Sequence, residues 1–166
     1  MPGVTALPAA SGYEIVLALH IIAVVVAFGA TFVYPIMFAI GAGRDPRSLP
    51  VLHRVEYTIE RTLMNFGLLV VLGAGIYLAS DGHVWSEFFV QWGLGTVIVI
   101  GALVGSVMIP TAKRAEALAE AAVAAAGAGA PDPGADYRVA VRRLSLVGAL
   151  LSALVLVTIA FMVIKP

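Results

Sequence analysis

The chain has 166 residues, of which 61% are hydrophobic and only 12% are charged, too few charged side chains to cover a soluble domain of this length. Ten basic and ten acidic residues give a formal net charge of zero, which argues against a nucleic-acid partner, and the absence of cysteine excludes disulfides, thiolate catalysis and cysteine-ligated metals. The composition therefore predicts a protein surrounded by lipid rather than by water.

The beginning of the chain does not have the composition of a cleaved leader. Residues 1–11 contain no Lys or Arg, whereas a secretory signal peptide has a basic start and a short apolar core. The first apolar run here, residues 15–43, is too long for such a core. We therefore expect this run to remain in the protein as a membrane helix.

Four stretches contain no Asp, Glu, Lys or Arg and are long enough to cross a bilayer, which takes about 20 mostly apolar residues. They are residues 15–43, 62–80, 88–112 and 144–164. Each must be helical because lipid offers no hydrogen bonds to the backbone. The sequence predicts an all-α, integral-membrane four-helix bundle that forms a single transmembrane domain over residues 1–166. Small residues such as Gly101 and Gly105 are expected to let the helices pack closely. The expected helices cover about residues 13–43, 60–80, 87–126 and 138–164.

The basic residues are concentrated in two loops, between the first and second runs and between the third and fourth. These residues are Arg44, Arg47, Arg54, Arg61, Lys113, Arg114, Arg138, Arg142 and Arg143. The positive-inside rule then predicts that both loops are cytoplasmic and that both termini lie on the outer face of a bacterial plasma (inner) membrane. Trp85 and Trp92 would mark an outer aromatic belt, and Tyr57 and Tyr137 an inner one.

Residues 49–61, in the first basic loop, are expected to be helical. Val51, Val55 and Ile59 recur every four residues with charged residues between them. This pattern is typical of a short interfacial helix, and the alternative is an extension of the second span.

The polar residues of this segment also have two interpretations. The first is a clamp for an anionic ligand, such as a propionate or a lipid phosphate. The second, which we favour, is a set of salt bridges and topology-setting arginines. The residues concerned are His53, Arg54, Glu56, Glu60 and Arg61.

The second basic loop is expected to begin with a helix that continues the third span. The segment after Lys113 is rich in alanine as far as residue 126, and alanine is the best helix former. Glu116 and Glu120 are predicted to face solvent. Gly and Pro residues within 127–137 then predict a cytoplasmic turn before the last helix.

His20 is, tyrosines apart, the only ionisable side chain well inside one of the runs. At about 100° per residue it shares a side of its helix with Ala27, Thr31 and Tyr34, so we expect it to point into the bundle. An ionisable residue inside a membrane is a hypothesis of function by default. Its neutral imidazole could ligate haem iron or copper, or carry a proton; the alternative is a structural hydrogen bond to a hydroxyl of the third or fourth helix.

The candidate cofactor site gathers the polar residues expected on inward faces. Its members are His20, Thr31, Tyr34, Arg61, Asn65 and Gln91. His20 is the candidate metal ligand. Haem b is the leading candidate cofactor and copper the second.

Three segments resemble a known family. Residues 13–35 read YEIVLALHIIAVVVAFGATFVYP, residues 60–67 read ERTLMNFG, and residues 73–78 read GAGIYL. Together they resemble a bacterial integral-membrane family of unknown function, domain of unknown function 2269, over about residues 13–119. The resemblance implies a membrane protein and no particular reaction.

The first helix also resembles those of two better-described groups, the small membrane protoporphyrinogen oxidases and the copper-resistance D-type proteins. Both have a Leu-His-hydrophobic opening helix, which corresponds to Leu19, His20 and the residues after them. The resemblance to the oxidases implies a haem ligand at His20 and a Lys near the start of the third helix. Residues 88–94 contain no Lys, which favours a binding protein over an enzyme.

Three functions follow from these observations. The first is a membrane protein of no established reaction that binds haem, a porphyrin or a metal in a pocket at His20. The second is a protoporphyrinogen-oxidase-like enzyme. The third is a structural subunit that forms a homo-oligomer or binds a membrane partner protein.

Overall fold

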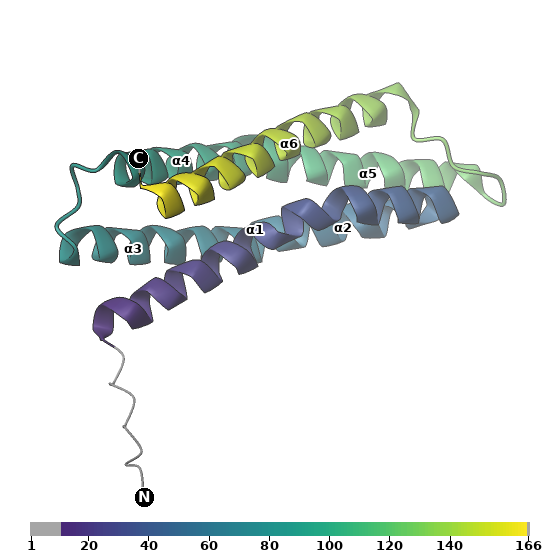
Figure 1. Ribbon diagram of the computed structural model, residues 1–166. Coiled ribbons are helices and arrows are strands. Elements are labelled where there is room, and N and C mark those ends of the chain that lie inside the picture. The colour runs from purple at the N-terminus through teal and green to yellow at the C-terminus, as the bar shows by residue number, and fades with distance from the viewer. Residues whose placement is uncertain (1–10, 166) are drawn as a thin grey trace, which may run out of the picture.

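The computed structural model describes residues 11–165, and all of their regular structure is helical (Figure 1). The elements are α1 (Gly12–Arg44), η1 (Pro46–Ser48), α2 (Leu49–Ile59), η2 (Glu60–Met64), α3 (Asn65–Asp81), α4 (Phe88–Leu103), η3 (Val104–Met108), α5 (Ile109–Ala126) and α6 (Gly134–Ile164). The predicted all-α class is therefore confirmed. The predicted placement of the two chain ends concerns residues 1–10 and 166, which lie outside the described residues.

Several elements join end to end into longer rods. The π-helical turn η2 connects α2 to α3, and a second π-helical turn, η3, connects α4 to α5. Four helices, of 33, 36, 39 and 31 residues, are consequently long and apolar enough to cross a membrane. The predicted four-helix membrane architecture is confirmed, and α2 is an extension of the second span rather than a separate interfacial helix.

The first rod begins with a reciprocal cap. Ser11 Oγ accepts a hydrogen bond from the backbone N–H of Glu14 at 3.3 Å, and Glu14 Oε2 accepts one from the backbone N–H of Ser11 at 2.8 Å. This capping box satisfies two backbone donors that the first turn leaves without partners. It fixes the start of α1 just before the long apolar run.

The rods pack differently at their two ends (Figure 1). At one end, α2 lies against α5, and α5 against α6, while the last part of α1 covers α2. We call this end, residues 34–61 and 108–143, the basic half, because it carries the arginine-rich loops. At the other end, the apolar half, α1 packs on α3 and α4 packs on α6.

Gly67 on α3 and Ala27 on α1 make a close helix crossing in the apolar half. A Cβ added at Gly67 would lie 2.5 Å from Ala27 Cβ and 3.3 Å from Ala27 Cα. Small residues allow membrane helices to approach in this way. Ala27 is completely buried, so the predicted inward side of α1 is confirmed.

Two glycines that were expected to make such contacts do not. A Cβ added at Gly101 or at Gly105 would meet no atom within 4 Å. The small-residue spacing on the third span therefore does not form a helix–helix contact within residues 11–165. Alanines on α5 take this role instead, since Ala112, Ala115 and Ala119 are at most 1% exposed.

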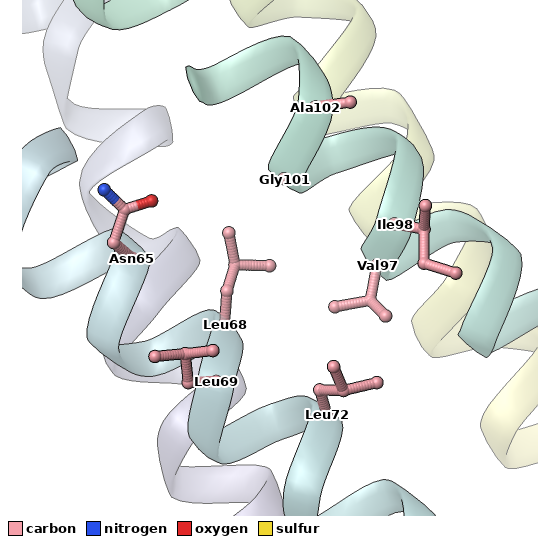
Figure 2. Close-up of a pocket in the computed structure, with 8 residues that line it drawn as sticks. All are labelled: Asn65, Leu68, Leu69, Leu72, Val97, Ile98, Gly101 and Ala102. Carbon is pink, nitrogen blue, oxygen red and sulfur yellow. The ribbon is translucent and has the colours of Figure 1, made fainter. Parts of the chain in front are cut away.

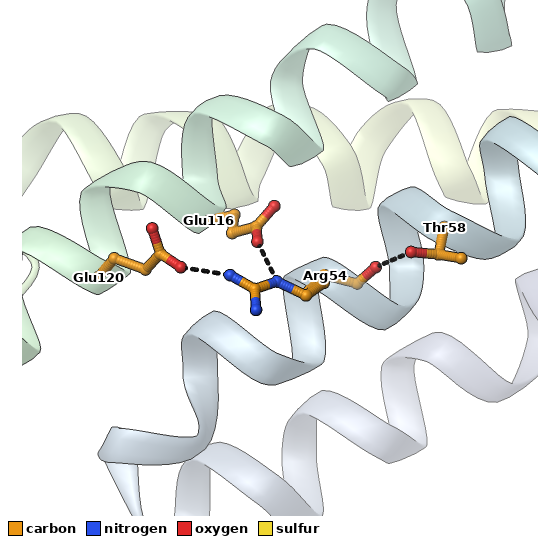
Figure 3. Close-up of polar contacts among 4 residues, drawn as sticks. All are labelled: Arg54, Thr58, Glu116 and Glu120. Atoms are coloured by element: carbon orange, nitrogen blue, oxygen red, sulfur yellow. Dashed lines mark hydrogen bonds and ion pairs between the residues drawn. The ribbon is translucent and has the colours of Figure 1, made fainter.

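An ion-pair bridge joins α2 to α5 on the surface of the basic half (Figure 3). Arg54 donates from Nε to Glu116 and from Nη2 to Glu120, each at 2.6 Å. This contact supports the salt-bridge interpretation for Arg54. The prediction that Glu116 faces solvent is wrong, because its side chain is only 14% exposed. Since Arg54 itself is exposed, water screens both ion pairs and the bridge contributes little stability.

Candidate functional site

The side of α2 that faces the bundle is polar. Val51 and Val55 are 61% and 39% exposed, whereas His53, Glu56 and Glu60 are at most 3% exposed. These three residues share one helix face because they are spaced three and four residues apart. The valines that recur every four residues therefore lie on the outer side of this helix.

A hydrogen-bonded chain connects α2 to α6. His53 Nδ1 lies 2.9 Å from Glu56 Oε2, and His53 Nε2 lies 2.9 Å from the hydroxyl of Tyr137. In the neutral tautomer with the proton on Nδ1, Nδ1–H donates to Glu56 and the Tyr137 hydroxyl donates to Nε2. The ring of Phe38 packs against the imidazole, with 4.6 Å between ring centroids. The imidazole is thus held in one orientation between an acid and a phenol.

Tyr137 differs from its sequence-based interpretation. It was expected in an aromatic belt at the inner membrane interface, but it is buried in the bundle and only 9% exposed. The hydrogen bond to His53 accounts for this position, since a phenol can be buried when its hydroxyl has a partner.

Glu60 lies one turn further along the same face and has no such partner. Both of its carboxyl oxygens, and the hydroxyl of Tyr34 on α1, are buried without a hydrogen-bond partner among residues 11–165. Glu56 and Glu60 are close enough for their charges to act on Tyr34, and Glu56 acts on Glu60 in the same way. We call Tyr34, His53, Glu56, Glu60 and Tyr137 the polar cluster.

The polar cluster has the chemistry of a proton site. Burying an ionised carboxylate without a counter-ion or hydrogen bonds is expensive, so these surroundings favour the neutral acid of Glu60. The imidazole of His53 can accept a proton at one nitrogen while it releases one from the other. Within the described part of the chain, no group of three His, Cys, Asp or Glu residues is arranged to hold a metal.

The six residues predicted to bind a cofactor lie in separate places. His20 is half-buried in the apolar half, where a Cβ added at Gly75 would be 3.4 Å from its Cε1 atom. Its Nδ1 atom is buried and has no hydrogen-bond partner among the described residues. The backbone of Val71 on α3 nevertheless lies close enough to the imidazole to be a hydrogen-bond partner, so the structural alternative for His20 stays open.

The other five residues do not surround His20. Thr31 donates to the carbonyl of Phe28 in its own helix at 2.7 Å, and Tyr34 belongs to the polar cluster. Arg61 lies in η2, and Asn65 lies one helical turn later, at the start of α3. Asn65 Nδ2 donates to the Arg61 carbonyl at 3.1 Å. Gln91 lies at the start of α4, where it donates to the carbonyl of Trp85.

A groove separates α3 from α4 in the apolar half (Figure 2). Its volume is about 330 Å³, and Asn65 is the most polar of the residues that line it. The lining residues are Asn65, Leu68, Leu69, Leu72, Val97, Ile98, Gly101 and Ala102. His20 is not among them, so the groove and the imidazole are distinct features.

The chain is similar to a known protein family. A family model described as "Predicted integral membrane protein (DUF2269)" matches residues 14–166. No curated protein and no solved structure matches the chain. The resemblance of the first helix to the oxidases and the copper-resistance proteins is not shown by these comparisons and stays a sequence-based prediction.

Proposed function

Because the chain belongs to the DUF2269 family of predicted integral membrane proteins, we propose that it functions in a lipid bilayer as a proton-binding protein, with Glu60 as the group that takes up and releases the proton. The observation that carries this proposal is the burial of both Glu60 oxygens without a hydrogen-bond partner within residues 11–165. A buried carboxyl group without a partner is costly to keep, and acids in such surroundings cluster at functional sites.

The rest of the polar cluster supplies a path for the proton. Glu56 stands between Glu60 and His53, and His53 connects Glu56 to Tyr137 on α6. Glu60 makes no hydrogen bond to Glu56 among the described residues, so a proton passes between the two carboxyl groups through a side-chain movement or a bridging water. From Glu56 the imidazole of His53 leads on toward α6. The π-helical turn η2, which begins at Glu60, supports the proposal because such turns are frequent at functional sites.

The arginine-rich loops support an orientation for this site. In the orientation we propose, the basic half faces the cytoplasm of a bacterium, the apolar half lies in the plasma membrane, and both chain ends are outside. The polar cluster would then exchange protons with the cytoplasmic side.

We expect infrared spectra of the reconstituted protein to contain the carbonyl band of a protonated carboxyl group that disappears on alkaline titration. Glu60→Gln should remove this band, because the amide cannot carry the proton. Glu14→Gln is the matched control and should keep the band, since Glu14 is exposed and its cap also accepts glutamine. A band that persists in Glu60→Gln would assign the proton to another group.

A second candidate function, a cofactor site at His20, is favoured by the buried Nδ1 atom without a hydrogen-bond partner among the described residues. In this proposal the imidazole would hold haem b or, second, copper. When bound, haem would supply electron-transfer or porphyrin chemistry. The chain would contribute the ligand atom and the apolar surroundings formed by α1 and α3.

This second candidate predicts a Soret band in detergent-purified protein from haem-supplemented cells. His20→Ala should abolish the band because the ligand atom is lost. His83→Ala should leave it unchanged, since His83 lies in the exposed connection between α3 and α4. A protein with neither a Soret band nor bound copper by metal analysis would leave His20 without a cofactor role.

A further inference from the structure

The groove between α3 and α4 exists because small residues on α4 leave space beside α3. Gly101 and Ala102 form its wall on α4, and a Cβ added at Gly101 would meet nothing within 4 Å. Leu68, only 7% exposed, forms its floor, whereas Leu69 and Ile98 at its edges are 68% and 60% exposed. The groove therefore opens at the outer surface of the bundle, which faces lipid in a membrane protein. Figure 2 shows the residues that line it.

The size of the groove limits what it can hold. Its lining on α3 runs from Asn65 to Leu72, which at 1.5 Å per residue is about 10 Å. A helix with its side chains is about 10 Å wide and several turns long, so it could not enter a space of about 330 Å³. That volume is at the lower end of the range for small-molecule sites. One segment of a hydrocarbon chain, lying along the groove, fits the dimensions and the apolar lining.

The two ends of the groove differ in polarity. Asn65 marks the end toward the basic half, and Arg61 lies one helical turn beyond it. The Arg61 guanidinium donates to the Tyr57 hydroxyl at 2.7 Å and lies over the Tyr57 ring. Among residues 11–165 it forms no ion pair, so most of its five donors remain free for an anion.

We propose that this groove binds one acyl chain of an anionic phospholipid, with the lipid phosphate against Arg61 and Asn65. Charge complementarity favours an anionic lipid. An acyl chain that lies between the leucines places its lipid headgroup at the end of the groove nearest Arg61. Arginine pairs with phosphate through two parallel hydrogen bonds. The site is independent of the polar cluster and of its proposed proton chemistry.

The test is native mass spectrometry of the protein released from nanodiscs that contain equal amounts of phosphatidylglycerol and phosphatidylcholine. Wild-type protein should retain one phosphatidylglycerol. Gly101→Leu should lose it, because the new side chain starts from a Cβ in open space and occupies the groove. Gly29→Leu is the matched control and should retain the lipid, since Gly29 is an exposed glycine of α1 with nothing within 4 Å of an added Cβ.

The headgroup contact is tested separately. Arg61→Gln should reduce the preference for phosphatidylglycerol over phosphatidylcholine about fivefold, the effect of one cation near the membrane surface, while a lipid chain stays bound. Thermal unfolding of each variant shows that the bundle is intact. Equal retention of the two lipids by wild type, or full retention by a folded Gly101→Leu, would overturn the proposal.

Discussion

Gly67→Val is expected to lower the free energy of unfolding by about 3 kcal/mol, the upper end of the cost of overpacking. The first atom added at Gly67 would already lie 2.5 Å from Ala27 Cβ and 3.3 Å from its Cα. The Ala27 backbone cannot swing aside as a long side chain would, so α1 and α3 must separate along their whole crossing. The measurement is unfolding in mixed micelles, followed by circular dichroism.

Gly73→Val is the matched control for this prediction. Gly73 lies on the same helix, is exposed, and has nothing within 4 Å of an added Cβ. The same side chain there should change stability by less than about 1 kcal/mol. If the two valine variants unfold alike, α1 and α3 do not cross as closely as Gly67 and Ala27 indicate.

His53→Ala is expected to cost about 3 kcal/mol, for a different reason. The substitution removes the partner of the Glu56 carboxylate and of the Tyr137 hydroxyl together, at a site where all three side chains are buried. A buried polar group left without a partner costs more than the hydrogen bond itself contributed. The loss should appear as a lower unfolding midpoint in the same micelle assay.

Tyr137→Phe separates the hydrogen bonds from the packing. It removes one hydroxyl and keeps the ring, so it should cost about 1 kcal/mol. In the double variant with His53→Ala the two losses should not add, because both include the same hydrogen bond. A His53→Ala protein as stable as Tyr137→Phe would mean that the Glu56 carboxylate finds water or another donor.

The membrane helices could be predicted from the sequence because lipid imposes a simple rule. An uncharged run such as residues 62–80 must satisfy its backbone internally, and the helix is the local structure that does so. The inward side of α1 was also predictable, since Ala27 and Tyr34 are small or polar residues on one face. These inferences need only local sequence.

The orientation of α2 could not be predicted in the same way. Periodicity shows that Val51 and Val55 share a face, but it does not show which face is buried. The decision depends on Tyr137, which lies 84 residues further along the chain and provides the hydrogen bond that allows His53 to be buried. The spacing of His53, Glu56 and Glu60 was a signal for this face, and it was interpreted as a set of surface salt bridges.

The candidate cofactor site could not be located from the sequence for the same reason, because it also depends on contacts between distant parts of the chain. Helical patterns place His20, Asn65 and Gln91 on particular sides of their own helices, but not at particular depths relative to one another. Depth is determined by where helices cross, as at Gly67, and by the lengths of their extensions. The prediction at His20 consequently stays a prediction about one residue rather than about a pocket.

The lengths of the rods have a consequence for membranes of different thickness. A rod of 39 residues extends about 58 Å, whereas the hydrocarbon layer measures about 30 Å. In the orientation proposed above, the arginine-rich end extends beyond the hydrocarbon layer, and neighbouring helices keep water from Glu60. A thinner or thicker bilayer would change the tilt of the rods or the area of apolar surface that is exposed to water. The interior around the buried acid would stay equally dry in either membrane.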